Sequence, residues 1–329
     1  MADLLNTLIE LRPEYIESVF EELTSDLTDI EFKFLPYKEV NRNYVDIGFF
    51  NFYHKPMSAA LPETPYVVTN YPITGEIKRV RGFHFKEGIP ITVTEMQELH
   101  QADPKYRKFF MIEKLDWLKT RAVIRMKQTI WDALRGVIDI SENGLVYHYE
   151  YSITAGSVTS SWANPQTDII SSIYSNVELL DDTVAKPRYL VLNSKTYRYF
   201  KTNEKINTLL ATAGYLRKND GIKELISDIG LDIVIIDDFY IDSNGNKVKF
   251  VKDDEVFIIG EGNYPLGNLI SLVDENTVTL DKPGRPGFWT QVIEKTNDNP
   301  RKIDIVAGIT FFPAIYHPDW VVHIADVTP

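Results

Sequence analysis

The chain has 329 residues, 44% of them hydrophobic and 25% charged, which is typical of a folded protein large enough for two or three domains. It contains no cysteine, which excludes disulfide bonds, cysteine nucleophiles and thiolate metal sites. Its formal net charge of −12 argues against a general nucleic-acid-binding protein, because such proteins neutralise phosphates with a surplus of cations.

Residues 1–44 are expected to form an N-terminal arm, because they hold too few apolar side chains for a core of their own. Pro13 and the sequence EYIESVFEEL after it predict a short helix, and an acidic connector follows. The first residues lack the pattern of a secretory signal. No apolar run in the chain approaches the roughly 18 residues of a membrane-spanning helix, so we expect no membrane contact.

Residues 45–100 are expected to form an extended loop, which begins with the aromatic sequence DIGFFNFYHKPM. Apolar alternation predicts strands at Tyr66–Thr69 and Ile89–Thr94. Between them lie four cations: Lys78, Arg79, Arg81 and Lys86. Two strands of this kind cannot bury a face of their own. The loop must therefore lie on another surface, which is a neighbouring subunit in an assembly or an active site in a monomeric enzyme.

Residues 103–137 predict one long helix of roughly 50 Å. Asp103 is a favourable N-cap, Pro104 suits the first helical position, and Gly136 is a favourable terminator. One face carries apolar or small side chains at intervals of three or four: Met111, Leu115, Leu118, Ala122, Met126, Ile130, Ala133 and Val137. The other face is predicted to be basic: Lys105, Arg107, Lys108, Lys114, Lys119, Arg121, Arg125 and Lys127.

The region after the long helix predicts a half-buried strand over 145–153 and a helix over 167–180. Residues 187–299 have the alternating strand and helix signals of a mixed α/β domain, including a hairpin turn at the Asn-Gly pair of SNGN. Residues 300–329 predict two apolar strands, which we expect to return to the domain of the long helix, formed by 101–186.

Two groups of acidic and amide side chains are candidate metal sites. Asp237 and Asp238 end an apolar strand, but no phosphate-binding loop accompanies them. A faint calcium-loop spacing is better explained by the hairpin, since its glycine falls at the wrong position; its residues are Asp242, Asn244, Asn246 and Asp253. The six histidines form no metal-binding motif. We therefore expect no catalytic residue, no metal and no cofactor.

The basic surfaces are the strongest positive feature of the sequence. They either form a solvated face paired with the chain's own acidic residues, or they pair with the acidic surface of a neighbouring copy. We favour the second interpretation. The candidate interface residues are Lys78, Arg79, Arg81, Lys86, Arg107 and Lys108.

The order of four segments carries a resemblance to a known family. The basic excursion PITGEIKRVRGFHFKEGIP precedes ADPKYRKFFMIEKLDWLKTR, which opens the long helix; ALRGVIDISENG closes it, and DIVAGITFFPAIYHPDWVVHIADV ends the chain. This order resembles the major capsid proteins of tailed bacteriophages of the lambda type, the major capsid protein E family with the Hong Kong 97-type fold. The match is strongest over residues 65–138 and 300–327.

The resemblance implies an α+β capsid fold. Its parts would be an N-terminal arm (1–44), an extended loop (45–100), a peripheral domain (101–186 and 300–329) with the long helix, and an axial domain (187–299). It also implies a non-enzymatic coat protein that forms pentamers and hexamers of an icosahedral shell around double-stranded DNA. Such a shell is assembled in the bacterial host cytoplasm and becomes the virion capsid.

The resemblance also implies partners. They are further copies of the chain, a portal and packaged DNA without sequence-specific binding, while a decoration protein is left open. Since no long removable N-terminal domain is present, we expect a separate scaffold protein. Two alternatives remain at this point: the shell of an encapsulin-type compartment with a pocket for a cargo peptide, or a metal-dependent enzyme whose extended loop covers Asp237 and Asp238.

Overall fold

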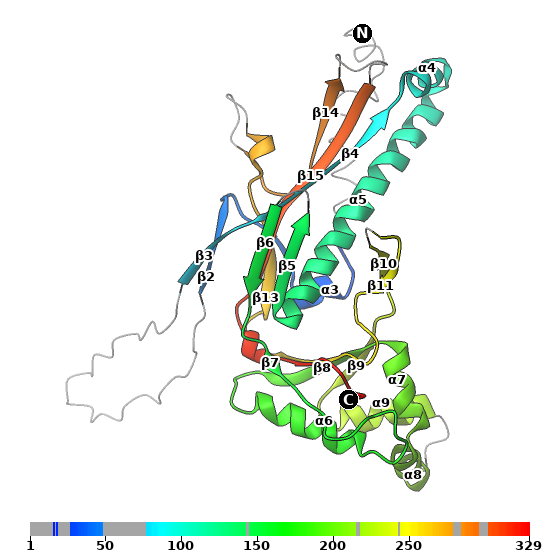
Figure 1. Ribbon diagram of the computed structural model, residues 1–329, viewed down its shortest axis with the longest axis vertical. Coiled ribbons are helices and arrows are strands. Elements are labelled where there is room, and N and C mark those ends of the chain that lie inside the picture. Colours follow the sequence, from blue (N-terminus) through cyan, green and yellow to red (C-terminus); the bar gives the residue numbers. More distant parts are fainter. Residues whose placement is uncertain are drawn as a thin grey trace, which may run out of the picture.

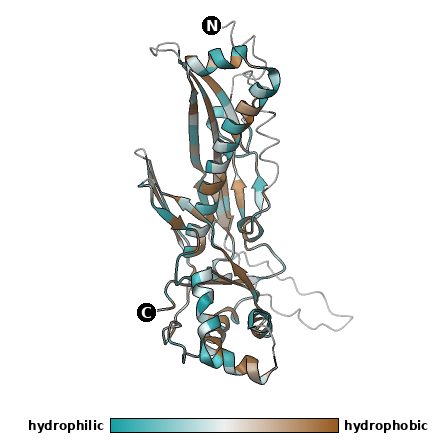
Figure 2. Cartoon of the chain, turned by 90° about the vertical axis from the view of Figure 1, so that its right-hand side faces the viewer, coloured by the Kyte–Doolittle hydropathy of each residue, from teal (hydrophilic) through white to brown (hydrophobic). Residues whose placement is uncertain are grey.

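The computed structural model describes residues 27–48, 77–142, 145–214, 218–242, 244–278, 284–295 and 302–329, together with Ile16 and Ser18. These residues form an elongated molecule in which two bodies are stacked along the longest axis (Figures 1 and 2). The upper body contains the long helix and one five-stranded sheet, and the lower body contains a second five-stranded sheet. The predicted strand at Tyr66–Thr69 and most of the predicted helix after Pro13 lie outside the described residues.

The predicted long helix is confirmed as α5, Pro104–Arg135. The carboxylate of its N-cap, Asp103, accepts hydrogen bonds from the amides of Lys105 and Tyr106 at 2.6 and 3.1 Å. The helix ends at Gly136, whose φ of 98° is a left-handed conformation that glycine adopts without steric cost. The predicted apolar face is buried at Met111, Leu115, Leu118, Met126, Ile130 and Ala133.

The upper sheet is built around one long strand, β15. Its first half lies between β4 and β14, and its second half pairs with β13, which in turn pairs with β1. Isoleucines of β15 are buried in the core that α5 also enters. The strands are β1 (Tyr37–Glu39), β4 (Phe83–Ile91), β13 (Gly267–Ser271), β14 (Trp289–Lys295) and β15 (Lys302–Ile315).

The predicted strand at Ile89–Thr94 is only partly correct. The strand ends at Ile91, and a helix, α4 (Val93–Gln101), begins directly after Thr92. Thr92 and Glu95 form a capping box, in which each side chain accepts a hydrogen bond from the other residue's backbone amide. This local pairing starts a helix where the apolar alternation alone indicated a longer strand.

The upper body also contains two antiparallel ribbons, of which the first projects from it and the second lies against it beside α5 (Figure 1). One consists of β2 (Tyr44–Gly48) and β3 (Ile77–Arg81), at the root of the predicted extended loop. The other consists of β5 (Val137–Glu142), which follows Gly136 directly, and β6 (Leu145–Glu150). The short helix α3 (Glu31–Phe34) packs Phe32 and Phe34 into the core, so part of the predicted arm belongs to the upper body.

The lower sheet has the order β7-β16-β12-β8-β9. Its centre, β12, is buried from Val256 to Gly260 because both of its faces are covered. Val256 and Ile258 join a core with the surrounding helices, whereas Phe257 and Ile259 join the core of the upper body. The strands are β7 (Thr154–Ala155), β8 (Lys186–Leu192), β9 (Asp232–Ile235), β12 (Val256–Glu261) and β16 (Val321–Ile324).

The helices of the lower body follow the predicted pattern. They are α6 (Ile169–Val177), the 3-10 turn η2 (Glu178–Leu180), α7 (Ser194–Thr202), α8 (Glu204–Thr212) and α9 (Lys218–Ser227). The predicted hairpin is formed by β10 (Phe239–Ile241) and β11 (Lys247–Lys249), with Gly245 at φ 81° in its turn. Two further 3-10 turns are η3 (Glu275–Thr277) and η4 (Pro318–Trp320).

The two sheets do not follow the predicted division at 299/300. The last strand, β16, pairs with β12 and belongs to the lower body, although we expected both terminal strands to return to the long helix. Conversely, β13 and β14 pair with β15 in the upper body. Pro313 lies within β15, and the segment around Pro318, between Ile315 and Val321, carries the chain from one sheet to the other.

Candidate assembly surface

The ribbon at the root of the extended loop holds the first predicted cations. Arg79 donates to the Asp46 carboxylate opposite it at 2.8 Å, and its guanidinium lies 4.1 Å from the centre of the Tyr44 ring. The hydrogen bond to Asp46 raises the pKa of Arg79. The exposed Arg81 has no side-chain partner among the described residues. Arg81, rather than Arg79, is thus available to a neighbouring molecule.

Most cations in the middle of α5 are paired within the chain. Lys114 binds Glu95 at 3.2 Å, Arg121 binds Glu87 at 2.5 Å, and Arg125 binds Glu142 at 2.7 Å. These acidic residues lie on α4, β4 and β5, which flank the helix. At these positions the first of the two sequence interpretations, a face paired with the chain's own acids, is the one that the structure supports.

Lys127 is not on a solvated face, which corrects the sequence-based expectation. Its side chain is 10% exposed, and its ammonium group lies 3.0 Å from Asp29 and 3.4 Å from Asp238. Burial lowers the pKa of Lys127, but the hydrogen bond with Asp29 and the charges of Glu31 and Asp238 outweigh it, so the pKa lies above its ordinary value. Long-range pairing with the segment before α3 was not readable from helical spacing.

The six predicted interface cations do not form one site. Lys78, Arg79 and Arg81 lie on β3 and Lys86 on β4, whereas Arg107 and Lys108 lie at the start of α5, by α4 at the top of the molecule (Figure 1). Lys86 and Lys108 are exposed and, in the described part of the chain, have no side-chain partner. Arg107 is partly buried, and both it and Lys78 make further contacts.

Sequence reasoning missed an exposed aromatic pair next to these cations. Tyr106 is 52% exposed and Phe109 is 65% exposed, beside the exposed Lys105 and Lys108. The apolar stripe that begins at Met111 lies on the opposite side of the helix. The signal was present, because helical spacing excludes both residues from the predicted buried face.

The two bodies are joined by a buried ionic cluster at the other end of α5. The Arg135 guanidinium donates to both oxygens of Glu255, at 2.8 and 3.0 Å, and His323 Nε2 lies 2.9 Å from the same carboxylate. Glu255 is only 2% exposed. Burial raises the pKa of Glu255, but hydrogen bonds from His323 and Arg135 outweigh it and lower the pKa to about 2.

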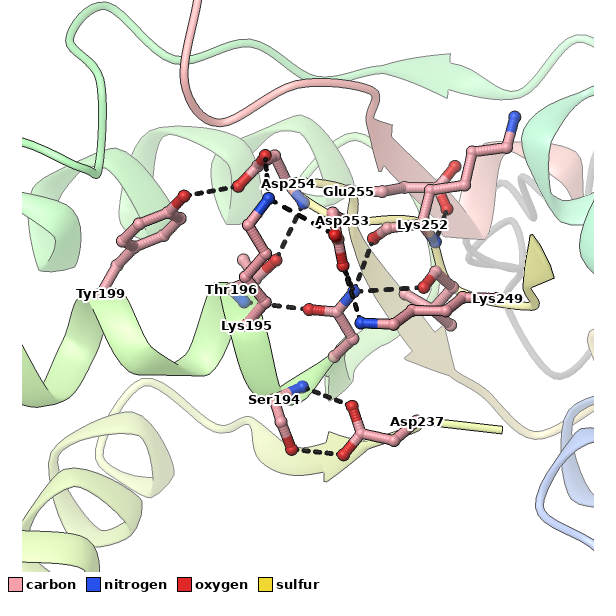
Figure 3. A network of polar contacts seen from close by, with 12 residues as sticks. Ser194, Lys195, Thr196, Tyr199, Asp237, Lys249, Lys252, Asp253, Asp254 and Glu255 are labelled. Carbon is pink, nitrogen blue, oxygen red and sulfur yellow. Dashed lines mark hydrogen bonds and ion pairs between the residues drawn. The ribbon is translucent and has the colours of Figure 1, made fainter. Parts of the chain in front are cut away.

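The acidic residues of the candidate metal sites have structural partners. Asp237 accepts hydrogen bonds from the amide and the hydroxyl of Ser194, the first residue of α7 (Figure 3). Asp238 instead pairs with Lys127. The two neighbouring carboxylates are thus held by different elements. Asp242 accepts from the amides of Asn244 and Asn246 and closes the hairpin turn.

Figure 3 shows that Asp253 and Asp254 both pair with Lys195, near the start of α7. Asp253 accepts from Asn193 and Lys249, both at 2.8 Å. Asp254, whose φ is 64°, accepts from Tyr199 at 2.7 Å and from Lys195 at 3.2 Å. Across the described ranges, no group of three or more histidine or acidic side chains is placed to hold a metal ion.

The comparisons identify the fold. A prophage protein of Escherichia coli CFT073, described as a capsid protein, superposes on this chain with a TM-score of 0.56 and 13% identity. The match covers 99% of this chain and 97% of that one. A phage-related protein of Bordetella bronchiseptica gives a TM-score of 0.56 and 11% identity, covering 94% of this chain and 97% of that one. These likenesses confirm the predicted α+β capsid fold of the Hong Kong 97 type.

The SrpI encapsulin of Synechococcus elongatus has a TM-score of 0.47 and 7% identity over 95% of this chain and 96% of that one, a likeness too low to carry an argument. No described helix is long and apolar enough to cross a membrane. A search of curated proteins found no match.

A match to a family sequence model identifies the family of this chain. The model described as phage major capsid protein E matches residues 70–325, more than half of the chain. This match covers the ribbon strand β3, the long helix, the lower body and both terminal strands. The chain is therefore a structural coat protein rather than an enzyme, and it belongs to the phage major capsid protein E family.

Proposed function

We propose that the chain assembles into pentamers and hexamers of an icosahedral shell that encloses double-stranded DNA. The proposal rests on the unpaired positive charge close to the root of the extended loop. Arg81 on β3 and Lys86 on β4, the next strand along the chain, are exposed and have no side-chain partner among the described residues, in a chain whose net charge is −12. A second copy supplies the acidic surface that these cations lack, and many weak contacts of this kind sum to a stable shell.

In this proposal the parts predicted from the sequence take their roles in the shell. The part of the predicted arm before α3 remains an arm, and the part of the predicted extended loop before β4 lies over a neighbouring copy, since α3 and β4 belong to the upper body. The upper body serves as the peripheral domain and the lower body as the axial domain around which capsomers close. A separate scaffold protein and a portal are further partners, a decoration protein stays open, and assembly takes place in the host cytoplasm.

The first test is to express the chain alone and to follow it by light scattering and negative-stain electron microscopy. We expect closed shells, tubes or ring-shaped capsomers. Compact monomers at every concentration and salt, also with a co-expressed scaffold, would contradict the proposal.

Charge reversal then tests the loop root. Arg81→Glu combined with Lys86→Glu is expected to prevent assembly while the circular dichroism spectrum and the unfolding transition stay unchanged, because neither cation has an intrachain partner in the described structure. The control is Lys223→Glu, a reversal at an exposed lysine on α9. Equal loss of assembly in the control would mean that total charge, and not this surface, decides the outcome.

A further inference from the structure

The ribbon of β2 and β3 has one buried side and one exposed side. Val45 and Ile47 are buried, and because side chains alternate along a strand, their neighbours lie on the opposite side. We name that opposite side the basic ribbon face: Tyr44, Asp46, Arg79 and Arg81. Asp46 pairs with Arg79, whereas the exposed Arg81 has no side-chain partner among the described residues. The face therefore presents one arginine whose charge the chain itself does not match.

A notch of about 520 Å³ lies between α5, the segment before α3 and the start of the β10–β11 hairpin. We name it the acidic notch, and its lining includes Asp29, Val123, Lys127, Asp237, Asp238 and Phe239. Phe239 is 49% exposed at its edge. Lys247 lies 4.7 Å from the centre of the Phe239 ring but, in the described structure, pairs with none of the carboxylates of the notch. The notch thus combines apolar contact area with acidic side chains.

Carboxylates outnumber cations in the acidic notch. Its lining holds three carboxylates and two ammonium groups: Asp29, Asp237, Asp238, Lys119 and Lys127. A fourth carboxylate, that of Glu31, lies 3.7 Å from the ammonium group of Lys127, is only 1% exposed and has one oxygen without a hydrogen-bond partner among the described residues. The side chains of Asp29 and Asp238 are 50% and 66% exposed, so both can accept further hydrogen bonds. A cation from another molecule would balance this surplus.

The ribbon and the notch lie on opposite lateral sides of the molecule, at the same level of its longest axis. Figure 1 looks down the shortest axis, and it shows β2 and β3 to the left of the upper sheet and the β10–β11 hairpin to the right of α5. A molecule that builds a thin wall lies with its shortest axis across that wall. When lower bodies surround the centre of a capsomer, the left side of one copy therefore meets the right side of the next.

We propose that the basic ribbon face of one copy docks in the acidic notch of the next copy of the same ring, with Arg81 against Asp29 and Asp238. This inference rests on the proposed function, because it names the acidic surface that Arg81 lacks. The contact joins two different surfaces and is heterologous, so repeating it between side-by-side copies closes a ring. A guanidinium group suits this role, since it can form two parallel hydrogen bonds with a carboxylate. Tyr44 and Phe239 add the aromatic contact area that is typical of protein interfaces.

Cysteine cross-linking tests the contact directly, since the chain has no cysteine of its own. A Tyr44→Cys chain, which keeps every charge of the contact, is mixed with a Phe239→Cys chain, assembled and oxidised in air. We expect a disulfide-linked heterodimer in the mixture and none in either variant alone. The matched control replaces Phe239→Cys by Leu209→Cys, a leucine of α8 that is 48% exposed. Equal cross-linking with Leu209→Cys, or none with Phe239→Cys, overturns the inference.

A double-mutant cycle gives a second readout. Arg81→Gln and Asp238→Asn should each raise the concentration needed for assembly about tenfold, since each removes one charge of the pair. Lys127 keeps Asp29 at 3.0 Å in the second variant, so the fold is retained. The double variant should lie within about threefold of either single one, because the pair is already broken. The control is Lys223→Gln, which removes an equal charge on α9 and should leave assembly unchanged. Additive losses of about a hundredfold in the double variant overturn the inference.

Failure of this contact and failure of the coat-protein function give different results. An unmodified chain that assembles, without a heterodimer of Tyr44→Cys and Phe239→Cys chains, leaves the function intact and removes this contact. An unmodified chain that stays monomeric under all conditions removes both. A disulfide within the Phe239→Cys sample alone would assign the notch to a symmetric contact. A Phe239→Cys thiol that is protected from alkylation only by a co-expressed scaffold would assign the notch to that protein, and either result overturns docking of the ribbon.

Discussion

The two ends of α5 both carry basic side chains, but the helix dipole favours those at one end and disfavours those at the other. At its C-terminal end, Arg135 is favourable for the helix dipole and is buried against Glu255, which ties the upper body to the lower body. At its N-terminal end, Lys105 and Lys108 oppose the dipole and remain exposed beside Tyr106 and Phe109. One end is completed within the chain, whereas the other is suited to a second molecule.

The difference shows which end of α5 stabilises the fold and which end is suited to association with another molecule. A buried ion pair contributes to a fixed geometry but leaves a large penalty when one partner is removed. An exposed charged patch contributes little to folding but selects its partner. Mutations at the two ends of one helix should therefore separate folding from assembly.

The largest effect is expected at the buried end. Glu255→Ala leaves the Arg135 guanidinium buried without its carboxylate, and we expect a loss of about 3–5 kcal/mol in the free energy of unfolding. Urea denaturation followed by tryptophan fluorescence measures it. The control is Glu261→Ala, which removes a glutamate that binds Arg188 at 3.5 Å on the surface and should change stability by less than about 0.5 kcal/mol. Similar losses in both variants would show that the buried ion pair contributes no more to stability than a surface ion pair.

Acid should weaken the same junction. The pKa of Glu255 is about 2 in the folded chain and 4.5 as a free side chain. A lowered pKa contributes stability that is fully present above 4.5 and is lost as the pH falls towards 2, in total roughly 3 kcal/mol for a shift of this size. Unfolding free energies measured between pH 6 and pH 3 should fall, and Glu255→Gln should flatten this dependence. An unchanged slope in that variant would assign the acid sensitivity to other groups.

A smaller loss is expected at the helix terminator. In Gly136→Ala the new methyl group meets a φ of 98° and lies 3.2 Å from the carbonyl oxygen of Tyr151. The left-handed conformation should cost about 1–2 kcal/mol, measured by thermal unfolding. Gly245→Ala is the control: Gly245 has a φ of 81°, and no atom lies within 4 Å of the added methyl group. This variant therefore measures the cost of the left-handed backbone without that of the close contact.

The smallest effect has the opposite sign. Lys105→Glu places an acid in the first turn of α5, where the dipole favours it, and should raise the free energy of unfolding by about 0.3–1 kcal/mol. The same variant should assemble less readily, because it reverses one charge of the exposed basic surface at the start of α5. Thermal unfolding and light scattering on one sample measure both. A variant that is both less stable and less able to assemble would remove the contrast between the two helix ends.

Local sequence signals determined the elements with the strongest spacing. Asp103, Pro104 and Gly136 fixed both ends of α5 because caps depend on the backbone next to them. The Asn-Gly pair likewise predicted the β10–β11 hairpin. The order of segments also identified the family and the α+β capsid fold before any contact was known.

Tertiary structure alone decided which elements share a sheet and which cations remain free. β16 joins β12 in the lower sheet, and β13 joins β15 in the upper one, because strand pairing depends on surfaces far apart in the sequence. Lys127 is buried by Asp29 and Asp238, and Arg79 is neutralised by Asp46, so neither has the role that helical or strand spacing suggested. Periodicity determines which side of an element a residue occupies, but only the folded chain determines what lies opposite.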